Sequence, residues 1–290
     1  MSPLSSQDAT YAAFVLALQQ QRGIGPVTIH RLLASIPSPE ALETFPREQL
    51  MHRLKGIPRV SQLIHFLYTP ENLQEAMAKG HAALQTYAKR GIHLLTPQMH
   101  HYPRNFLRLP EATRPLILYA YGHLEVLQQP FIAFLGKSTL APQPFEHAQQ
   151  LMMHVLERGY HLAGGVRTGF DVVLHKLANG RPSLMVSDAG FARIPPPLRP
   201  YVVQNIRRGG LLLSTFPMEQ EFYPHQIQDQ IRVLGLLSQG LVWAYTPAST
   251  IERQAYDTCQ QMQIPQILLP EHTSPTTALE ALMHLPPPPA

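Results

Sequence analysis

Short apolar runs alternate with stretches of helical periodicity in the second half of the chain. The runs at 131–135 and 160–163 each end on a glycine turn, and a helical stretch at 145–158 lies between them. This order predicts two parallel strands joined by a helix, with both turns at the carboxyl edge of one sheet, where open α/β sheets bind ligands. Glycine lets the backbone approach a phosphate, and the helix that follows offers free N–H groups.

Further apolar runs extend this pattern in both directions. They lie at 92–95, 114–122, 183–186, 210–214, 240–244 and 266–269. Helical stretches at 200–208 and 251–262 separate some of them. Strands that alternate with helices predict an α/β fold with a Rossmann-like, mostly parallel sheet.

The first 78 residues have a helical pattern instead. Tyr11, Phe14, Val15 and Leu18 share one helix face, which predicts a small all-α domain ahead of the sheet. We therefore expect a helical domain at 1–78, a Rossmann-like domain at 79–272 and a proline-rich flexible tail at 273–290.

Within the helical domain, Gly23 and Gly25 flank an isoleucine between two helices, the pattern of a helix-hairpin-helix module. Such glycines free backbone N–H groups to face a DNA phosphate. A degenerate echo follows at 54–60. The alternative is a tight turn between two packed helices that does not bind DNA. This alternative stays open because residues 1–78 contain six basic and six acidic residues and so show no basic excess.

The charge is uneven along the chain. The formal net charge is only +4, but residues 158–208 carry eight Lys/Arg against two acids, and residues 209–272 carry two against six. A basic excess suits a polyanion partner, although a solvated basic face is the alternative. The eight are Arg158, Arg167, Lys176, Arg181, Arg193, Arg199, Arg207 and Arg208.

Several classes of site are disfavoured. Cys259 is the one cysteine, which excludes a disulfide framework and fits a cytoplasmic location. The fifteen histidines show no metal-ligand spacing, so we expect no metal and no cofactor. Gly136-Lys137-Ser138-Thr139 matches the end of a P-loop, but Phe131 stands where the upstream glycine is needed. No apolar stretch is long enough to span a membrane.

Taken together, the order of motifs resembles the bacterial DNA-processing protein family, DprA or Smf. The matching segments are 91–96, 102–106, 115–122, 132–138, 164–171 with His175, 209–217, 222–224 as a loose match, and 230–238. Some positions depart from the family pattern. Ser138 and Thr168 stand where the family has arginines, and an acidic residue is missing from 244–250. We expect no C-terminal winged-helix module of the kind that many members have.

The resemblance implies a non-enzymatic protein that binds single-stranded DNA along the glycine turns and hands it to a RecA-type recombinase, in natural transformation or recombination. A homodimer is expected. We expect Asp171 to be the N-cap of the helix after the second turn. The candidate DNA-binding residues are Gly136, Lys137, Ser138, Gly164, Gly165, Arg167, Thr168, Gly169, Lys176 and Arg232, with Arg207 and Arg208 nearby.

Two alternatives stay open. The wider superfamily includes nucleotide-binding and nucleotide-processing proteins such as phosphoribohydrolases, but the nearest match to their signature, 248–252, lacks the glycines. A degenerate family member that makes only protein contacts is the other.

Overall fold

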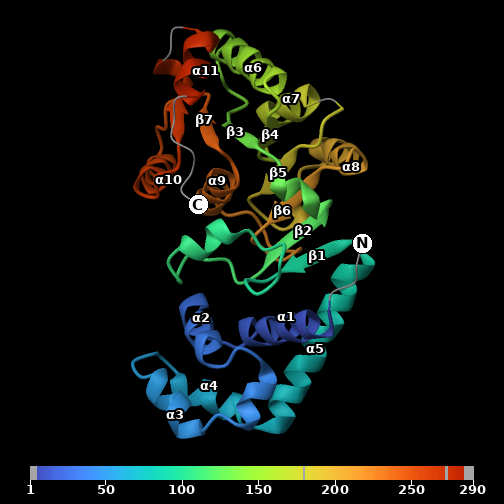
Figure 1. Cartoon of the computed structure of the whole chain (residues 1–290), viewed down its shortest axis with the longest axis vertical. Coiled ribbons are helices and arrows are strands. Elements are labelled where there is room, and N and C mark those ends of the chain that lie inside the picture. Colours follow the sequence, from blue (N-terminus) through green and yellow to red (C-terminus); the bar gives the residue numbers. More distant parts are fainter. Residues whose placement is uncertain (1–4, 179, 272–273, 284–290) are drawn as a thin grey trace. The chain divides into compact units, whose positions relative to one another are not determined.

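The computed structural model describes residues 5–178, 180–271 and 274–283, and divides the chain into two compact units, 1–118 and 119–290 (Figure 1). Residues up to 118 therefore make most of their contacts within the first unit, and residues from 119 on make most of theirs within the second. The boundary expected from the sequence, after residue 78, falls inside a continuous helix.

The first unit is mainly helical. Its helices are α1 (Ser6–Gln19), α2 (Pro26–Ser35), α3 (Arg47–Arg53), α4 (Val60–Leu67) and α5 (Pro70–Lys89), followed by strand β1 (Ile92–Leu95). Short 3-10 helices lie at Pro39–Glu43 and Arg104–Arg108.

Helix α1 forms the centre of this unit. Ser5 caps it by accepting a hydrogen bond from the Asp8 N–H at 3.0 Å, and residues 11–18 are all buried. Helix α5 packs along it, and a Cβ at Gly80 would lie 2.4 Å from the Ala13 carbonyl oxygen. Only glycine allows the two backbones to approach so closely.

The second unit contains the sheet. Its strands are β2 (Leu118–Gly122), β3 (Phe131–Leu135), β4 (His161–Gly164), β5 (Leu184–Ser187), β6 (Leu211–Ser214), β7 (Gly240–Trp243) and β8 (Gln266–Leu268). They lie in the order β2-β6-β5-β4-β3-β7-β8, with β2 antiparallel to β6 and the other pairs parallel. The predicted α/β fold with a mostly parallel sheet is confirmed.

Helices connect these strands and cover the sheet. They are α6 (Pro142–Glu157), α7 (Gly169–Leu177), α8 (Arg199–Arg207), α9 (Gln226–Leu237), α10 (Thr250–Gln261) and α11 (Pro275–Met283). From β3 the chain moves through β4 and β5 to β6, whereas β7 and β8 extend the sheet on the other side of β3. Because parallel crossovers are right-handed, α6, α7 and α8 cover one face of the sheet and α10 covers the other.

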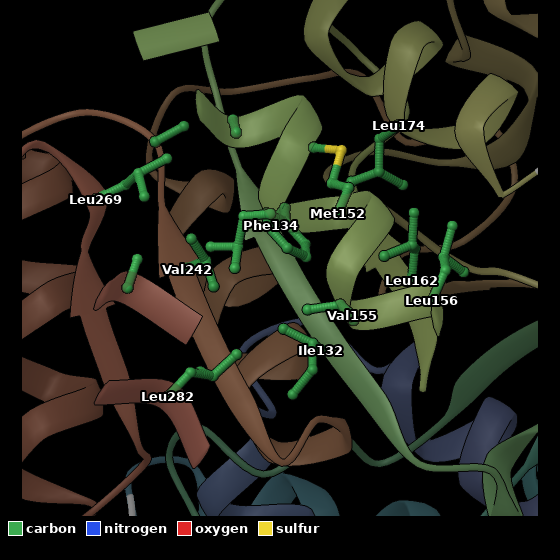
Figure 2. Close-up of a cluster of buried hydrophobic side chains, with 14 of the residues drawn as sticks. Ile132, Phe134, Met152, Val155, Leu156, Leu162, Leu174, Val242, Leu269 and Leu282 are labelled. Atoms are coloured by element: carbon green, nitrogen blue, oxygen red, sulfur yellow. The ribbon is translucent and has the colours of Figure 1, made fainter. Parts of the chain in front are cut away.

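The main core lies between β3 and α6. Figure 2 shows Ile132 and Phe134 of β3 beside Met152 and Val155 of α6, and all four are buried. Each such side chain contributes about 1.5–3 kcal/mol when it leaves water. The result is a rigid support for the loops at the ends of the strands.

Part of the expected tail belongs to this core. Helix α11 lies within 273–290, and its Ala278 and Leu282 are buried in the same cluster (Figure 2). These apolar residues at i and i+4 form the buried face of the helix. Residues 284–290 lie outside the described part of the chain.

Candidate nucleic-acid interface

The loops after β3, β4, β5, β6 and β7 meet at one side of the sheet, which we call the carboxyl edge. Strands β3 and β7 are neighbours, with Leu135 paired to Trp243. The strand order reverses between them, and this switch point is where open α/β sheets bind ligands. Lys137 follows β3, and Tyr245 follows β7. The sequence therefore placed its first glycine turn at the correct edge.

The glycines of both turns have packing reasons of their own. A Cβ at Gly136 would lie 2.2 Å from the Phe170 ring, and a Cβ at Gly164 would lie 2.8 Å from a Leu174 methyl group. Helix α7 thus approaches the ends of β3 and β4 because these positions lack side chains. A ligand is not needed to explain them.

The second turn has its backbone N–H groups satisfied by the protein itself. Asp171 Oδ2 accepts hydrogen bonds from the Arg167 N–H at 2.8 Å and the Thr168 N–H at 2.7 Å. Ser138 Oγ accepts one from the Gly169 N–H at 2.8 Å. A bound phosphate would normally take such groups at a helix N-terminus. Here Gly165, Thr168 and Gly169 surround an internal carboxylate.

Asp171 differs from the sequence prediction in its position. Thr168 is the N-cap of α7, and Asp171 is the third helical residue of a capping box. The Asp171 side chain, three residues after the N-cap, reaches back to the backbone N–H of Thr168. This spacing of three residues makes Thr168 the N-cap and Asp171 its partner in the capping box. Burial raises the pKa of Asp171, against the lowering effect of the backbone hydrogen bonds.

Arg167 is held by an acid and an aromatic ring. Its guanidinium donates to both oxygens of Asp188, with Nε–Oδ2 at 2.5 Å and Nη2–Oδ1 at 2.6 Å. The side chain of Asp188 is 2% exposed and that of Arg167 is 27% exposed. The Arg167 Cζ atom lies 3.8 Å from the centroid of the Phe222 ring. One face of this cation is therefore already covered.

Lys137 is paired in the same way. Its Nζ atom lies 2.6 Å from Glu252 Oε1 and 4.2 Å from the centroid of the Tyr245 ring. Glu252 Oε2 accepts hydrogen bonds from the Ala248 and Ser249 N–H groups at the start of α10. Burial pushes the pKa of Glu252 up, but Lys137 and these N–H groups hold it below its usual value. Burial, followed by Glu252, raises the pKa of Tyr245.

Two predicted DNA-binding residues lie away from these turns. Lys176 is in the last turn of α7, and a nine-residue helix spreads its ends by about 12 Å. Arg232 is in α9 and forms an ion pair with Asp229 at 2.7 Å. The structure thus groups Gly136, Lys137, Ser138, Gly164, Gly165, Arg167, Thr168 and Gly169 but not these two.

The carboxyl edge also carries aromatic residues that were not among the candidate binding residues predicted from the sequence. They follow β6 in the segment 222–225. Tyr223 is 49% exposed, and its ring stacks on His225 at 5.9 Å with an interplanar angle of 14°. Phe222 covers Arg167. Three rings within four residues after a predicted strand were a usable signal, because that position belongs to the ligand edge of the sheet.

The hairpin of the first unit has a cation beside it. Gly23 has a left-handed backbone with φ of +78°, and Gly25 is the N-cap of α2. The Arg59 side chain packs against Gly23, where an added Cβ would lie 2.3 Å from its Nη1 atom. The predicted hairpin and its echo at 54–60 are therefore neighbours within this unit.

Comparison with known families supports the resemblance found in the sequence. A family model described as DNA recombination-mediator protein A matches residues 93–250, more than half of the 290 residues. The chain belongs to this family. The predicted membership of the DprA family is confirmed. A comparison with curated protein sequences found no match.

Two solved DprA structures share the fold. DNA processing protein A from Streptococcus pneumoniae has a TM-score of 0.61 at 14% identity, covering 92% of this chain and 87% of that one. The protein from Helicobacter pylori, described by its single-stranded DNA binding mode, has a TM-score of 0.52 at 21% identity and covers 65% and 86%. At these identities the likeness shows the DprA fold alone.

In the described residues, no helix has both the length and the apolar character that crossing a membrane requires. Across the same residues, no cluster of three or more His, Cys, Asp or Glu side chains is arranged to hold a metal ion.

Proposed function

We propose that the chain is a non-enzymatic, single-stranded DNA-binding member of the DprA family, and that the DNA crosses the carboxyl edge. The observation that carries the proposal is the exposed Tyr223–His225 stack next to the Arg167–Phe222 pair. Proteins that bind single strands combine cations that follow the backbone with aromatic rings on which bases stack. The segment 222–225 and Arg167 supply both.

Binding at this edge requires an exchange of partners. Lys137 and Arg167 form ion pairs with Glu252 and Asp188, so a phosphate must compete with those carboxylates. We therefore expect stacking to contribute a large share of the affinity. The dissociation constant should be about 1–100 μM at physiological salt, as for non-specific electrostatic binding.

The test is a titration of labelled oligo-dT followed by fluorescence anisotropy. We expect Tyr223→Ala to weaken binding by about 5- to 150-fold, because one base–aromatic stack contributes about 1–3 kcal/mol. Tyr223→Phe is the matched control, since it keeps the ring and should bind like the wild type. If the wild type does not bind at micromolar concentration in low salt, the proposal fails.

The finer roles implied by the family are part of the same proposal. We propose that the chain forms a homodimer and delivers single strands to a RecA-type recombinase during DNA uptake or recombination. Size-exclusion chromatography with light scattering tests the dimer. Recombinase loading on DNA already coated by a single-strand-binding protein tests delivery. If the protein is a monomer and does not accelerate recombinase loading, the proposed dimer and the proposed delivery are both wrong, and only the DNA-binding proposal remains.

A further inference from the structure

Three neighbouring helices end at the side of the sheet opposite the carboxyl edge. Helices α6, α7 and α8 finish just before β4, β5 and β6, which lie next to one another in the sheet. We call the residues at these three helix ends the amino edge. Gly159, Gly180 and Gly209 adopt left-handed backbone conformations there, with φ of +86°, +82° and +87°. Each of the three helices is thus followed by a glycine with a left-handed backbone.

Most of the basic excess seen in the sequence falls on the amino edge. Its exposed Lys and Arg residues are Arg158, Lys176, Arg181, Arg207 and Arg208. Carboxylates nearby include Glu157, next to Arg158, and Glu125, in the short helix before β3. The five cations outnumber these acids, so the surface is positive.

The contacts of these cations leave most of their charge open to solvent. Arg181 donates a hydrogen bond to the Leu156 carbonyl, and Lys176 Nζ lies 5.4 Å from the centroid of the Tyr201 ring. In the part of the chain that the structure describes, no ion pair involves Arg158, Arg207 or Arg208. A helix dipole favours a cation at each C-terminus, but it does not neutralise a whole side-chain charge.

The amino edge is also held in place from within. Asn205, near the end of α8, accepts a hydrogen bond from the Ser183 N–H at 3.0 Å and donates one to the Ser183 carbonyl at 2.9 Å. His161 Nδ1 lies 3.0 Å from the Pro182 carbonyl. Hydrogen bonds therefore connect the starts of the neighbouring strands with the end of α8. The backbone that carries the cations is held in place by these bonds.

We propose that the amino edge is a second nucleic-acid surface, which binds phosphates without contacting bases and accepts duplex DNA. The three strand starts span about 10 Å, and duplex DNA carries about one charge per 1.7 Å, so several phosphates fall within reach. Tyr160 and Tyr201 are only half-exposed, so this surface lacks the open stacked rings of the carboxyl edge. The proposal extends the proposed function but does not depend on single-strand binding.

The test uses the variant R158Q/R207Q/R208Q and a labelled duplex titrated at several salt concentrations. The slope of log K against log salt is negative, and each lost phosphate contact should reduce its magnitude by about 1. We therefore expect the magnitude of the slope to fall by about 3 in this variant. Duplex affinity at low salt should fall more than about tenfold. The control variant R47Q/K89Q/R104Q has the same net charge and lies at exposed positions that belong to neither edge of the sheet, and it should keep the wild-type slope.

A slope unchanged in the amino-edge variant would overturn the proposal, as would an equal loss in the control. Because the three arginines are exposed and form no ion pair with any described residue, the variant should melt within a few degrees of the wild type. If it does not fold, the double variant R207Q/R208Q should lower the slope by about 2. The Tyr223 variants in the oligo-dT titration test the carboxyl edge separately, so failure of one surface is distinguishable from failure of the other.

Discussion

The carboxyl edge and the amino edge of the sheet differ in whether their cations have acidic partners. At the carboxyl edge, Lys137 and Arg167 are each paired with a carboxylate that is almost buried. At the amino edge, Arg158, Arg207 and Arg208 have no acidic partner among the described residues. The difference shows that a charge count along the sequence does not locate a binding surface. What counts is which cations the fold leaves unpaired.

Geometry explains why several cations that follow the glycine turns in the sequence lie away from them in the structure. A helix that follows a parallel strand runs back along the sheet, so its last turn lies at the far side. Lys176 is seven residues after Gly169 but about 10 Å away along α7. Proximity in sequence to a glycine turn therefore does not mean proximity in space.

The largest effect should come from Asp171, which organises the carboxyl edge. Asp171→Ala removes the acceptor of two N–H groups and half of the capping box. We expect the free energy of unfolding to fall by about 3 kcal/mol, from the lost cap and the unsatisfied donors. Urea denaturation measures it. Arg158→Gln at the amino edge should change it by less than about 0.5 kcal/mol, and similar losses in both variants would contradict the comparison.

Acid should destabilise the protein through His175, which lies between the two edges. Its Nε2 donates to the Gly165 carbonyl at 2.8 Å, and its Nδ1 lies 3.1 Å from the Ser183 hydroxyl. Burial lowers the pKa of His175 to about 4. The unfolded chain takes up this proton below about pH 6.5, whereas the folded protein does so only near pH 4. Stability should therefore fall by about 3 kcal/mol across that range.

Urea denaturation between pH 7 and pH 4 measures this loss. Other groups titrate in the same range, so His175→Gln is the comparison. The variant cannot take up the proton and should show a flatter dependence on pH above 5, even if it is less stable throughout. Parallel curves for the two proteins would show that His175 is not the group responsible.

The smallest effect concerns Lys137. Glu252→Gln removes the competing charge but keeps a residue that completes a capping box, so α10 should remain capped. A freed Lys137 gains about one phosphate contact, so oligo-dT affinity should rise by about three- to tenfold at low salt. Duplex affinity should not change. An unchanged oligo-dT affinity would remove Lys137 from the DNA path.

The fold was largely predictable from the sequence, because strands and helices have different apolar periods. The runs at 131–135, 183–186 and 210–214 all proved to be strands. Both glycine turns came together at the predicted edge. The exception at the second turn has a physical cause, since the capping box makes Thr168 the N-cap and places Asp171 three residues further along, not at the cap.

The ion pairs of the site were beyond sequence reasoning. Arg167 and Asp188 are 21 residues apart, and Lys137 meets Glu252 only because β3 and β7 are neighbours. Pattern and spacing describe single elements, whereas these pairs depend on the strand order. The sequence therefore identified residues at the carboxyl edge but not the partners that occupy them.

The most direct test of the two-edge account measures one protein against two substrates. R158Q/R207Q/R208Q is titrated with a short oligo-dT and with a longer, stably paired duplex, under the same series of salt concentrations. The account predicts that duplex binding loses most of its salt dependence and falls more than about tenfold, while a short oligo-dT of about six nucleotides binds as it does to the wild type. Equal losses for both substrates, or no loss for the duplex, would contradict it.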